Sequence, residues 1–137
     1  MNRWFRAAVF GWLTVPLAAQ SVVFLSPTGD DILGTGTRSA PWKSLQKGVD
    51  SVASGGQVRL LPGRYADPAT ITTTVQLVAD TPSTALIGPR SAAGAHVSVR
   101  GATAVVIEGV VCEGASEPIG VRITAGATST RLVNCRF

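Results

Sequence analysis

Two six-residue segments near the end of the chain match each other at an offset of 25 residues. Ile107–Cys112 aligns with Leu132–Phe137, and each carries a turn residue, Gly or Asn, at its third position. Earlier segments around Leu60 and Leu77 fit the same pattern, although the spacing is uneven. A repeat of about 20 to 50 residues is typical of architectures in which each unit hides its apolar face by stacking on its neighbours. The repeat therefore limits the chain to a few fold classes.

The chain after position 56 consists of short, strand-like runs separated by Gly and Pro, which number 15 and 8 in the whole sequence. A unit of about 24 residues that holds several short strands fits one coil of a parallel β-helix. Leucine-rich repeats have a similar length, but their leucine pattern is absent. A Greek-key sandwich, in which the match is coincidental, is the remaining alternative. We expect an all-β solenoid whose stacked inward residues are Leu60, Leu77, Ile107 and Leu132.

Length and composition exclude other classes. A chain of 137 residues is enough for one domain. Its hydrophobic fraction of 45% and charged fraction of 15% rule out a disordered charged tail and a charge-rich coiled coil.

The first 20 residues have the layout of a secretory signal peptide. A start that contains arginine precedes the apolar stretch 7–17, and small residues surround the expected cleavage between Ala19 and Ser21. An uncleaved anchor is the alternative, because apolar residues continue beyond the expected cleavage site. We expect the leader to be removed, giving a secreted protein without membrane contact.

Net charge argues against a nucleic-acid partner. The formal charge of +4 includes Arg3 and Arg6 of the leader, so the mature part carries 4 − 2 = +2. The remaining arginines are scattered, whereas nucleic-acid binding requires a basic stripe or patch.

One helix is expected between residues 21 and 56. Leu45, Val49 and Val52 recur at helical spacing, Ser44 is a suitable N-cap, and the glycine pair 55–56 would end the helix. Residues 21–56 would then form an entrance strand, a loop and a capping helix, and residues 57–137 the first coils.

Three segments resemble right-handed parallel β-helix proteins of the pectate-lyase-like superfamily. Residues 23–31 (VFLSPTGDD) with 36–49 (GTRSAPWKSLQKGV) are similar to the entrance of these proteins, 56–65 (GQVRLLPGRY) to their first coil, and 133–137 (VNCRF) to their recurrent coil motif. The resemblance implies that the helix caps the N-terminal end of the coils. It does not fix the chemistry, because the superfamily includes lyases, esterases, epimerases, hydrolases and proteins of no known activity.

The chain stops at Phe137 within a strand-like run, so we expect a truncated β-helix with an open C-terminal edge. Apolar Leu132, Val133 and Phe137 at that edge would be a template for pairing with another chain. Self-association is therefore expected.

Strand alternation turns the neighbours of the inward residues outward. One expected column contains Arg59, Gln76, Val106 and Arg131, and the next contains Leu61, Val78, Glu108 and Val133. Such a face can hold a sugar acid, since arginine binds a carboxylate through two parallel hydrogen bonds. An ordinary solvated face is the alternative. The candidate substrate-binding residues are therefore Arg59, Gln76, Glu108 and Arg131.

Neither a metal site nor a catalytic residue can be identified. Calcium enters only through the resemblance, because a lyase of this superfamily would need carboxylates to hold it. The acidic candidates lie in different turns and strands without paired spacing; they are Asp80, Glu108, Glu113, Glu117 and the pair Asp30-Asp31. We expect no metal and no cofactor, and if the protein is an enzyme, a polysaccharide-lyase-like one.

The remaining candidate side chains are expected to be structural. His96, the one histidine, has no cysteine or carboxylate at ligand spacing. Trp42 and Tyr65 could stack on a sugar ring, but packing beneath the helix is the expected use. Asn134 occupies the position of Gly109 one coil earlier, and both residue types tolerate the left-handed backbone of a tight corner.

Two cysteines in a secreted chain raise the question of a disulfide. At an offset of 25, Cys112 and Cys135 lie diagonally, with Cα atoms roughly 8 Å apart, beyond the usual disulfide range of about 4.4 to 6.8 Å. We expect free, buried thiols that pack as small apolar residues, whereas an offset of 23 would allow a bond. The sequence thus favours a secreted β-helix that binds or processes an acidic polysaccharide; the alternative is a non-catalytic structural or adhesive solenoid.

Overall fold

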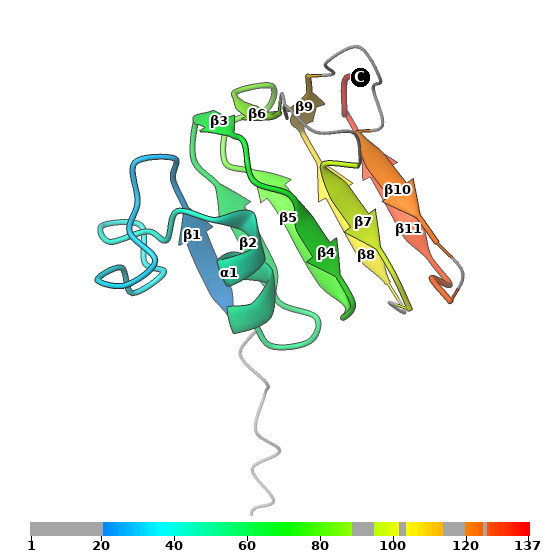
Figure 1. Ribbon diagram of the computed structural model, residues 1–137, viewed down its shortest axis with the longest axis horizontal. Helices are drawn as coiled ribbons and strands as arrows, with labels where there is room; N and C mark the ends of the chain where they lie inside the picture. The colour runs from blue at the N-terminus through cyan, green and yellow to red at the C-terminus, as the bar shows by residue number, and fades with distance from the viewer. Residues whose placement is uncertain (1–20, 89–94, 102–103, 114–119, 125) are drawn as a thin grey trace, which may run out of the picture.

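The computed structural model describes residues 21–88, 95–101, 104–113, 120–124 and 126–137. The expected leader, residues 1–20, lies outside them. The described chain winds through three stacked parallel sheets, which we call sheets A, B and C (Figure 1). The expected class, a parallel β-solenoid, is confirmed, and a Greek-key sandwich is ruled out because every strand pair that the structure describes is parallel.

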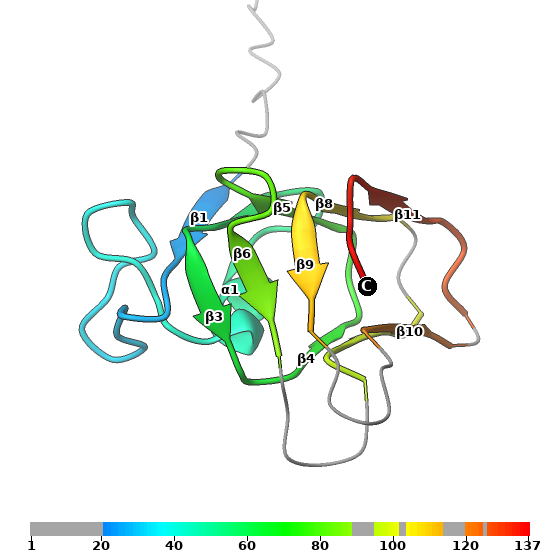
Figure 2. The same cartoon turned by 90° about the horizontal axis from the view of Figure 1, so that it is seen from above.

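Successive strands go to different sheets, so each coil adds one strand to each sheet. Sheet A has the order β1 (Val22–Leu25), β2 (Gln57–Leu60), β5 (Val75–Ala79), β8 (Val105–Glu108) and β11 (Thr130–Val133). Sheet B has the order β3 (Gly63–Tyr65), β6 (Ala85–Ile87) and β9 (Val110–Cys112), which Figure 2 shows side by side. Sheet C has the order β4 (Ala69–Ile71), β7 (Val97–Val99) and β10 (Val121–Ile123).

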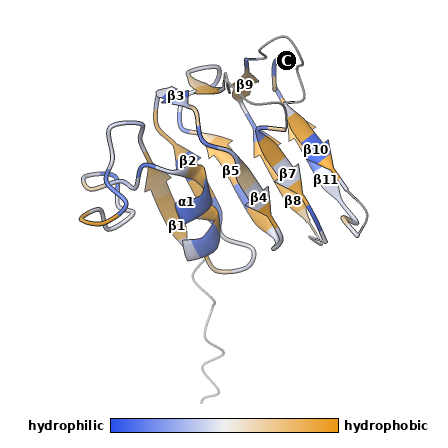
Figure 3. Cartoon of the chain, viewed as in Figure 1, coloured by the Kyte–Doolittle hydropathy of each residue, from blue (hydrophilic) through white to orange (hydrophobic). Residues whose placement is uncertain are grey.

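The core lies inside the coils. Most strands alternate buried and half-buried residues, as expected when one face of a sheet packs on a common interior. The largest fully buried side chains are aliphatic: Leu25, Leu45, Leu60, Ile71, Leu77, Ile87 and Ile107. Figure 3 shows that the strands are mostly apolar and that the turns between them are more polar.

The stacking register is correct for the later coils and wrong for the first one. Leu132 pairs with Ile107 and Ile107 pairs with Leu77, as expected. Leu77 pairs with Val58 rather than with Leu60, which lies beside Ala79. A shift of two residues keeps the same side chains inward, so the apolar pattern cannot distinguish the two registers.

Two runs that were expected to be single strands are each divided by a corner. The run from Thr70 to Val78 divides into β4 and β5 at Thr72–Thr74, because threonines have strand propensity and hide the corner. The run from Val105 to Val111 divides at Gly109.

Gly109 and Asn134 form equivalent corners in successive coils. Their φ angles are 71° and 49°, and the Gly109 N–H donates to Val133 O at 2.9 Å. The corner predicted for Asn134 is therefore confirmed, and glycine and asparagine adopt this left-handed conformation more readily than most residues.

Helix α1 (Leu45–Ser51) begins as predicted, with the Ser44 hydroxyl accepting the Lys47 N–H. It ends earlier than expected, because Val52 already has an extended backbone (φ −82°, ψ 141°). Leu45, Val49 and Val52 are all buried in the core. The helix packs against β1 and β4.

Candidate functional site

The four candidate substrate-binding residues all lie on sheet A, but in a different arrangement from the expected one. Arg59 shares a row with Glu108, separated from it by Val78, while Gln76 shares a row with Arg131. The expected row of Arg59 with Gln76 is wrong, because the first coil is shifted by two residues. In each row the two polar residues are two strand spacings apart, about 9.6 Å.

Leu61 does not join the outward column that the sequence predicted. It follows the end of β2, and its N–H donates to Leu25 O at 2.9 Å. Arg59 occupies that row of the first coil instead.

Arg59 is held by neighbours on the outer face of sheet A. Its Nε donates to Gln57 Oε1 at 2.8 Å, and its Nη1 lies 3.3 Å from Asp80 Oδ1. Gln57 in turn donates through Nε2 to Gln76 Oε1 at 3.4 Å. Arg59 and Gln76 are therefore linked through Gln57, and part of the Arg59 guanidinium is already used within the protein.

The entrance loop contributes a second arginine to this group. Arg38 donates through Nη1 and Nη2 to the two carboxylate oxygens of Asp80, at 3.1 and 2.8 Å, and its guanidinium carbon lies 5.6 Å from the centre of the Phe24 ring. We call Arg38, Gln57, Arg59, Gln76 and Asp80 the sheet A network. Hydrogen bonds from Arg38 lower the pKa of Asp80 most and those from Arg59 lower it further, whereas burial opposes them.

Sequence reasoning missed Arg38 and Gln57 and placed Asp80 only among calcium candidates. Arg38 and Asp80 are 42 residues apart, so no local spacing connects them. Strand alternation does predict that Gln57 points outward, but the wrong register did not place it beside Gln76.

Glu108 and Arg131 lie away from the network. Neither forms a salt bridge with another residue that the structure describes. Arg131 is exposed, and Glu108 is half-buried. On sheet A, Arg59 on β2 is therefore partly occupied by hydrogen bonds and an ion pair within the protein. Arg131 on β11 has no salt-bridge partner among the described residues.

Trp42 and Tyr65 are used in packing, as expected. Tyr65 is 3% exposed, and its hydroxyl lies 2.9 Å from Leu25 O and 2.8 Å from Leu61 O. The indole Nε1 of Trp42 donates to Gly34 O at 2.8 Å, and Lys47 Nζ lies 5.4 Å from the indole ring.

His96 lies in a separate cluster between sheets B and C. It is 4% exposed, and its Nδ1 has no hydrogen-bond partner in the structure. Nearby, Arg64 forms a salt bridge with Glu113 and donates to Gly88 O at 3.2 Å. A Cβ at Gly88 would lie 2.9 Å from the imidazole, so Gly88 leaves the room that the ring needs.

The entrance-loop acids bind backbone groups. Asp30 Oδ1 accepts the N–H groups of Ile32 and Leu33, and Asp31 Oδ1 accepts those of Lys43 and Ser44. The described residues contain no group of three or more metal-capable side chains. Glu117 lies outside the described residues.

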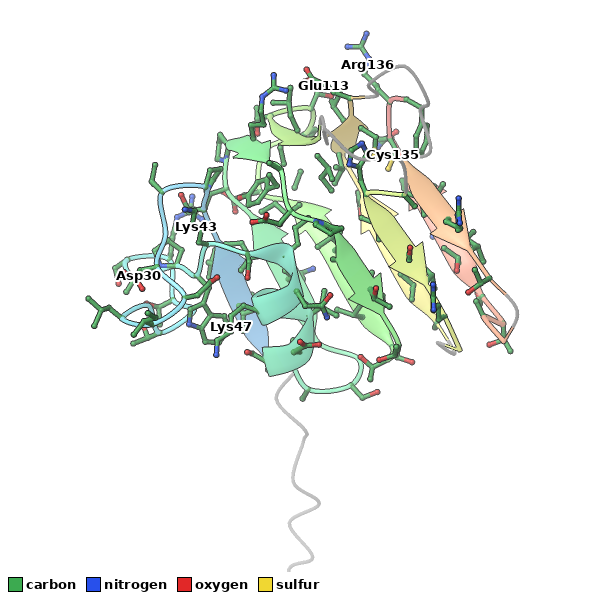
Figure 4. The ribbon with its side chains drawn as sticks, in the orientation of Figure 1. Asp30, Lys43, Lys47, Glu113, Cys135 and Arg136 are labelled. Carbon is green, nitrogen blue, oxygen red and sulfur yellow. The ribbon has the colours of Figure 1, made fainter. Side chains whose placement is uncertain are left out.

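The cysteines are both free thiols in the structure, as expected. The expected burial is correct for Cys112 and wrong for Cys135, which is half-buried because no described strand lies beyond β11 to cover it. Val111 pairs with Arg136, which is the expected offset of 25 and places Cys112 opposite Phe137. Cys112 is buried, and burial, with a smaller contribution from Cys135, raises its pKa to about 11. Figure 4 shows Cys135 near Glu113 and Arg136, at the far end from Asp30, Lys43 and Lys47.

Among the described residues, no helix has the length and hydropathy to span a membrane. Searches of protein-family models, curated proteins and solved structures find no match to this chain. The fold and the arrangement of side chains therefore carry the functional argument.

Proposed function

We propose that this chain forms the N-terminal end of a secreted right-handed parallel β-helix that binds an acidic polysaccharide. The parallel crossovers support the right-handed form, because such connections are right-handed in about 98% of cases. The binding surface would be the outer face of sheet A, with Arg131, Gln76, Arg59 and Glu108 as contacts.

Contacts along the first edge support the N-terminal position. On sheet A, Phe24 N–H donates to Gly36 O at 2.8 Å, and Trp42 N–H donates to Phe24 O at 3.1 Å. On sheet C, the Gln46 side chain accepts the Thr70 N–H at 2.8 Å and donates to Thr70 O at 3.2 Å, as a neighbouring strand would. Such edge protection suits the first coil of a stack, because unpaired strand edges template association.

The row that joins Gln76 to Arg131 carries the binding proposal. Both side chains project from the same face of the parallel sheet, and Arg131 has no salt-bridge partner among the described residues. A guanidinium in this state can bind a carboxylate through two hydrogen bonds, and an amide can bind sugar hydroxyls. A linear polymer lying across the strands would meet these groups in succession.

Affinity electrophoresis through gels containing polygalacturonate or alginate, with neutral dextran as a control polymer, tests the proposal. We expect retardation by the acidic polymers alone, and about fivefold weaker retention for Arg131→Ala. Arg122→Ala is the matched control, because Arg122 lies on sheet C beside Ser98 and its loss changes the net charge equally. Equal effects of the two substitutions, or no retention by either acidic polymer, would contradict the proposal.

Polysaccharide cleavage is tested with the same polymers. Incubation with calcium while following the absorbance of an unsaturated product distinguishes a lyase from a binding module. A rise in absorbance would assign lyase activity, and a flat trace with retained binding would assign a binding module.

A structural or adhesive solenoid is the second candidate, and the sheet A network favours it. Asp80 binds both Arg38 and Arg59, so these charges join the entrance loop to the first coils instead of facing a ligand. This candidate predicts no retention by any acidic polymer, together with loss of stability when the network is broken.

A further inference from the structure

A pocket of about 100 Å³ lies at the junction of the entrance loop, the start of α1 and the first coil. Lys43 and Leu45 line it from the helix side, and Arg64, Tyr65 and Asp67 line it from β3 and the turn that follows. It is separate from the sheet A network, which contributes none of these residues. Figure 4 shows Lys43 on the entrance-loop side of the molecule.

Part of the pocket lining is apolar and almost fully buried. Tyr65 and Leu45 are 3% and 1% exposed, and Pro27 completes the wall. The Tyr65 hydroxyl hydrogen-bonds to the carbonyl oxygens of Leu25 and Leu61, and these bonds hold the ring in place. An apolar lining of this kind binds a short carbon stem.

Three charged residues, Lys43, Arg64 and Asp67, line the pocket. Lys43 forms no salt bridge with any described residue, whereas Arg64 Nη1 is bound by Glu113 and by Gly88 O, neither of which lines the pocket. The backbone of Lys43 is fixed, because its N–H donates to Asp31 Oδ1 at 2.8 Å. Burial works to raise the pKa of Asp31, but hydrogen bonds from Ser44 and Lys43 outweigh it and lower the pKa, so this anchor is ionised at neutral pH.

We infer that this pocket binds the carboxylate end of a small organic acid, with the carboxylate at Lys43 and the adjoining carbons against Tyr65 and Leu45. Its volume is below the range of about 300 to 1,000 Å³ for whole drug-sized ligands, so the remainder of the ligand stays outside. The inference does not depend on polysaccharide binding by sheet A. Asp67 also lines the pocket, and its negative charge would oppose a bound carboxylate by like-charge repulsion.

Substitutions of Lys43 and Asp67 should change the affinity for a carboxylate in opposite directions. Lys43→Ala removes an attractive charge, and we expect about fivefold weaker binding. Asp67→Asn removes a repulsive charge and should strengthen binding by a similar factor. Lys47→Ala is the matched control, since Lys47 lies over Trp42 and does not line the pocket.

The experiment is an NMR titration of the intact chain at low salt with sodium D-galacturonate and sodium butyrate, and with galactose and butyramide as neutral analogues. Binding by either acid but not by its neutral analogue, with opposite effects of the Lys43 and Asp67 substitutions, supports the inference. The tighter of the two acids identifies a sugar acid or an aliphatic acid as the source of the carboxylate. Equal binding of the neutral analogues, no binding by either acid, or equal effects of the Lys43 and Lys47 substitutions would overturn it.

Discussion

Arg38 and Asp80 form a two-pronged ion pair across 42 residues of sequence, with N–O distances of 3.1 and 2.8 Å. Arg38 belongs to the entrance loop, and Asp80 follows β5 in the second coil. The Asp80 side chain is 10% exposed, whereas that of Arg38 is 63% exposed. The pair therefore ties a long loop to the coils at a point where the acid is fixed and the base remains in contact with solvent.

Asp80→Asn should lower the free energy of unfolding by about 1 kcal/mol, because two exposed arginines lose their shared carboxylate and solvent screens part of the effect. Urea denaturation at pH 7 measures the change. Asp67→Asn is the control, since Asp67 forms no salt bridge with a described residue. Equal midpoints for the two variants would show that the ion pair is energetically neutral.

The stability of the protein should fall as the pH drops below about 4. The folded-state pKa of Asp80 lies below its ordinary value of 3.8, owing first to Arg38. The unfolded chain therefore takes up a proton first on acidification, and the stabilisation present above that value is lost as the pH decreases through the folded-state pKa. Unfolding free energies between pH 7 and pH 3 should decline less steeply for Asp80→Asn than for the wild type. Parallel profiles would be inconsistent with this cause.

Gly48→Ala should destabilise the protein although alanine favours helix by about 1 kcal/mol. A Cβ at position 48 would lie 2.8 and 2.9 Å from the two methyl groups of Leu25, which is fully buried. Overpacking of this kind costs about 1 to 3 kcal/mol, so the net change should be a loss. Thermal unfolding measures it, and Gly48→Ala combined with Leu25→Ala should recover part of the loss that Gly48→Ala causes on its own. An increase in Tm for the single variant would contradict the packing argument.

The chain should contain two free thiols when it is unfolded without reductant and titrated with a thiol reagent. In the native protein, Cys135 should react before Cys112, because burial, aided by Cys135, raises the pKa of Cys112 to about 11 and limits access to it. Cys112→Ser and Cys135→Ser assign the two phases. A titration of zero thiols would show a disulfide and would conflict with the offset of 25.

The 137-residue polypeptide should self-associate through the edge of sheet A. Among described strands, β11 pairs only with β8, and three large apolar residues are exposed in or near this last coil, namely Ile123 at 52%, Leu132 at 41% and Phe137 at 70%. Light scattering after size exclusion should give a mass that rises with concentration, and Leu132→Glu should reduce it. Ile32→Glu is the control, because Ile32 is 91% exposed in the entrance loop. A constant monomer mass would contradict this expectation.

Three features of the fold could be read from the sequence because each depends on local chemistry. The offset between Ile107 and Leu132 predicted their direct pairing, since side chains repeat when coils stack. Ser44 identified the start of α1 through its hydroxyl, and Asn134 identified a left-handed corner.

The register of the first coil and the sheet A network could not be read in this way. Alternation specifies which face of a strand is buried but is unchanged by a shift of two residues, so Val58 and Leu60 were equivalent candidates for pairing with Leu77. The four candidate binding residues share one sheet, as predicted, but the rows in which they lie depended on that register.

The sequence by itself determined a solenoid of parallel strands, because apolar periodicity, a cap residue and corner residues act within a few positions of the chain. The tertiary structure decided which charges meet. Arg38 reaches Asp80, and Lys43 lines a pocket with Arg64, only because the entrance loop folds back over the first coils. The spacing of charged side chains in the sequence does not indicate which of them will be neighbours. These contacts therefore depend on the path of the entrance loop.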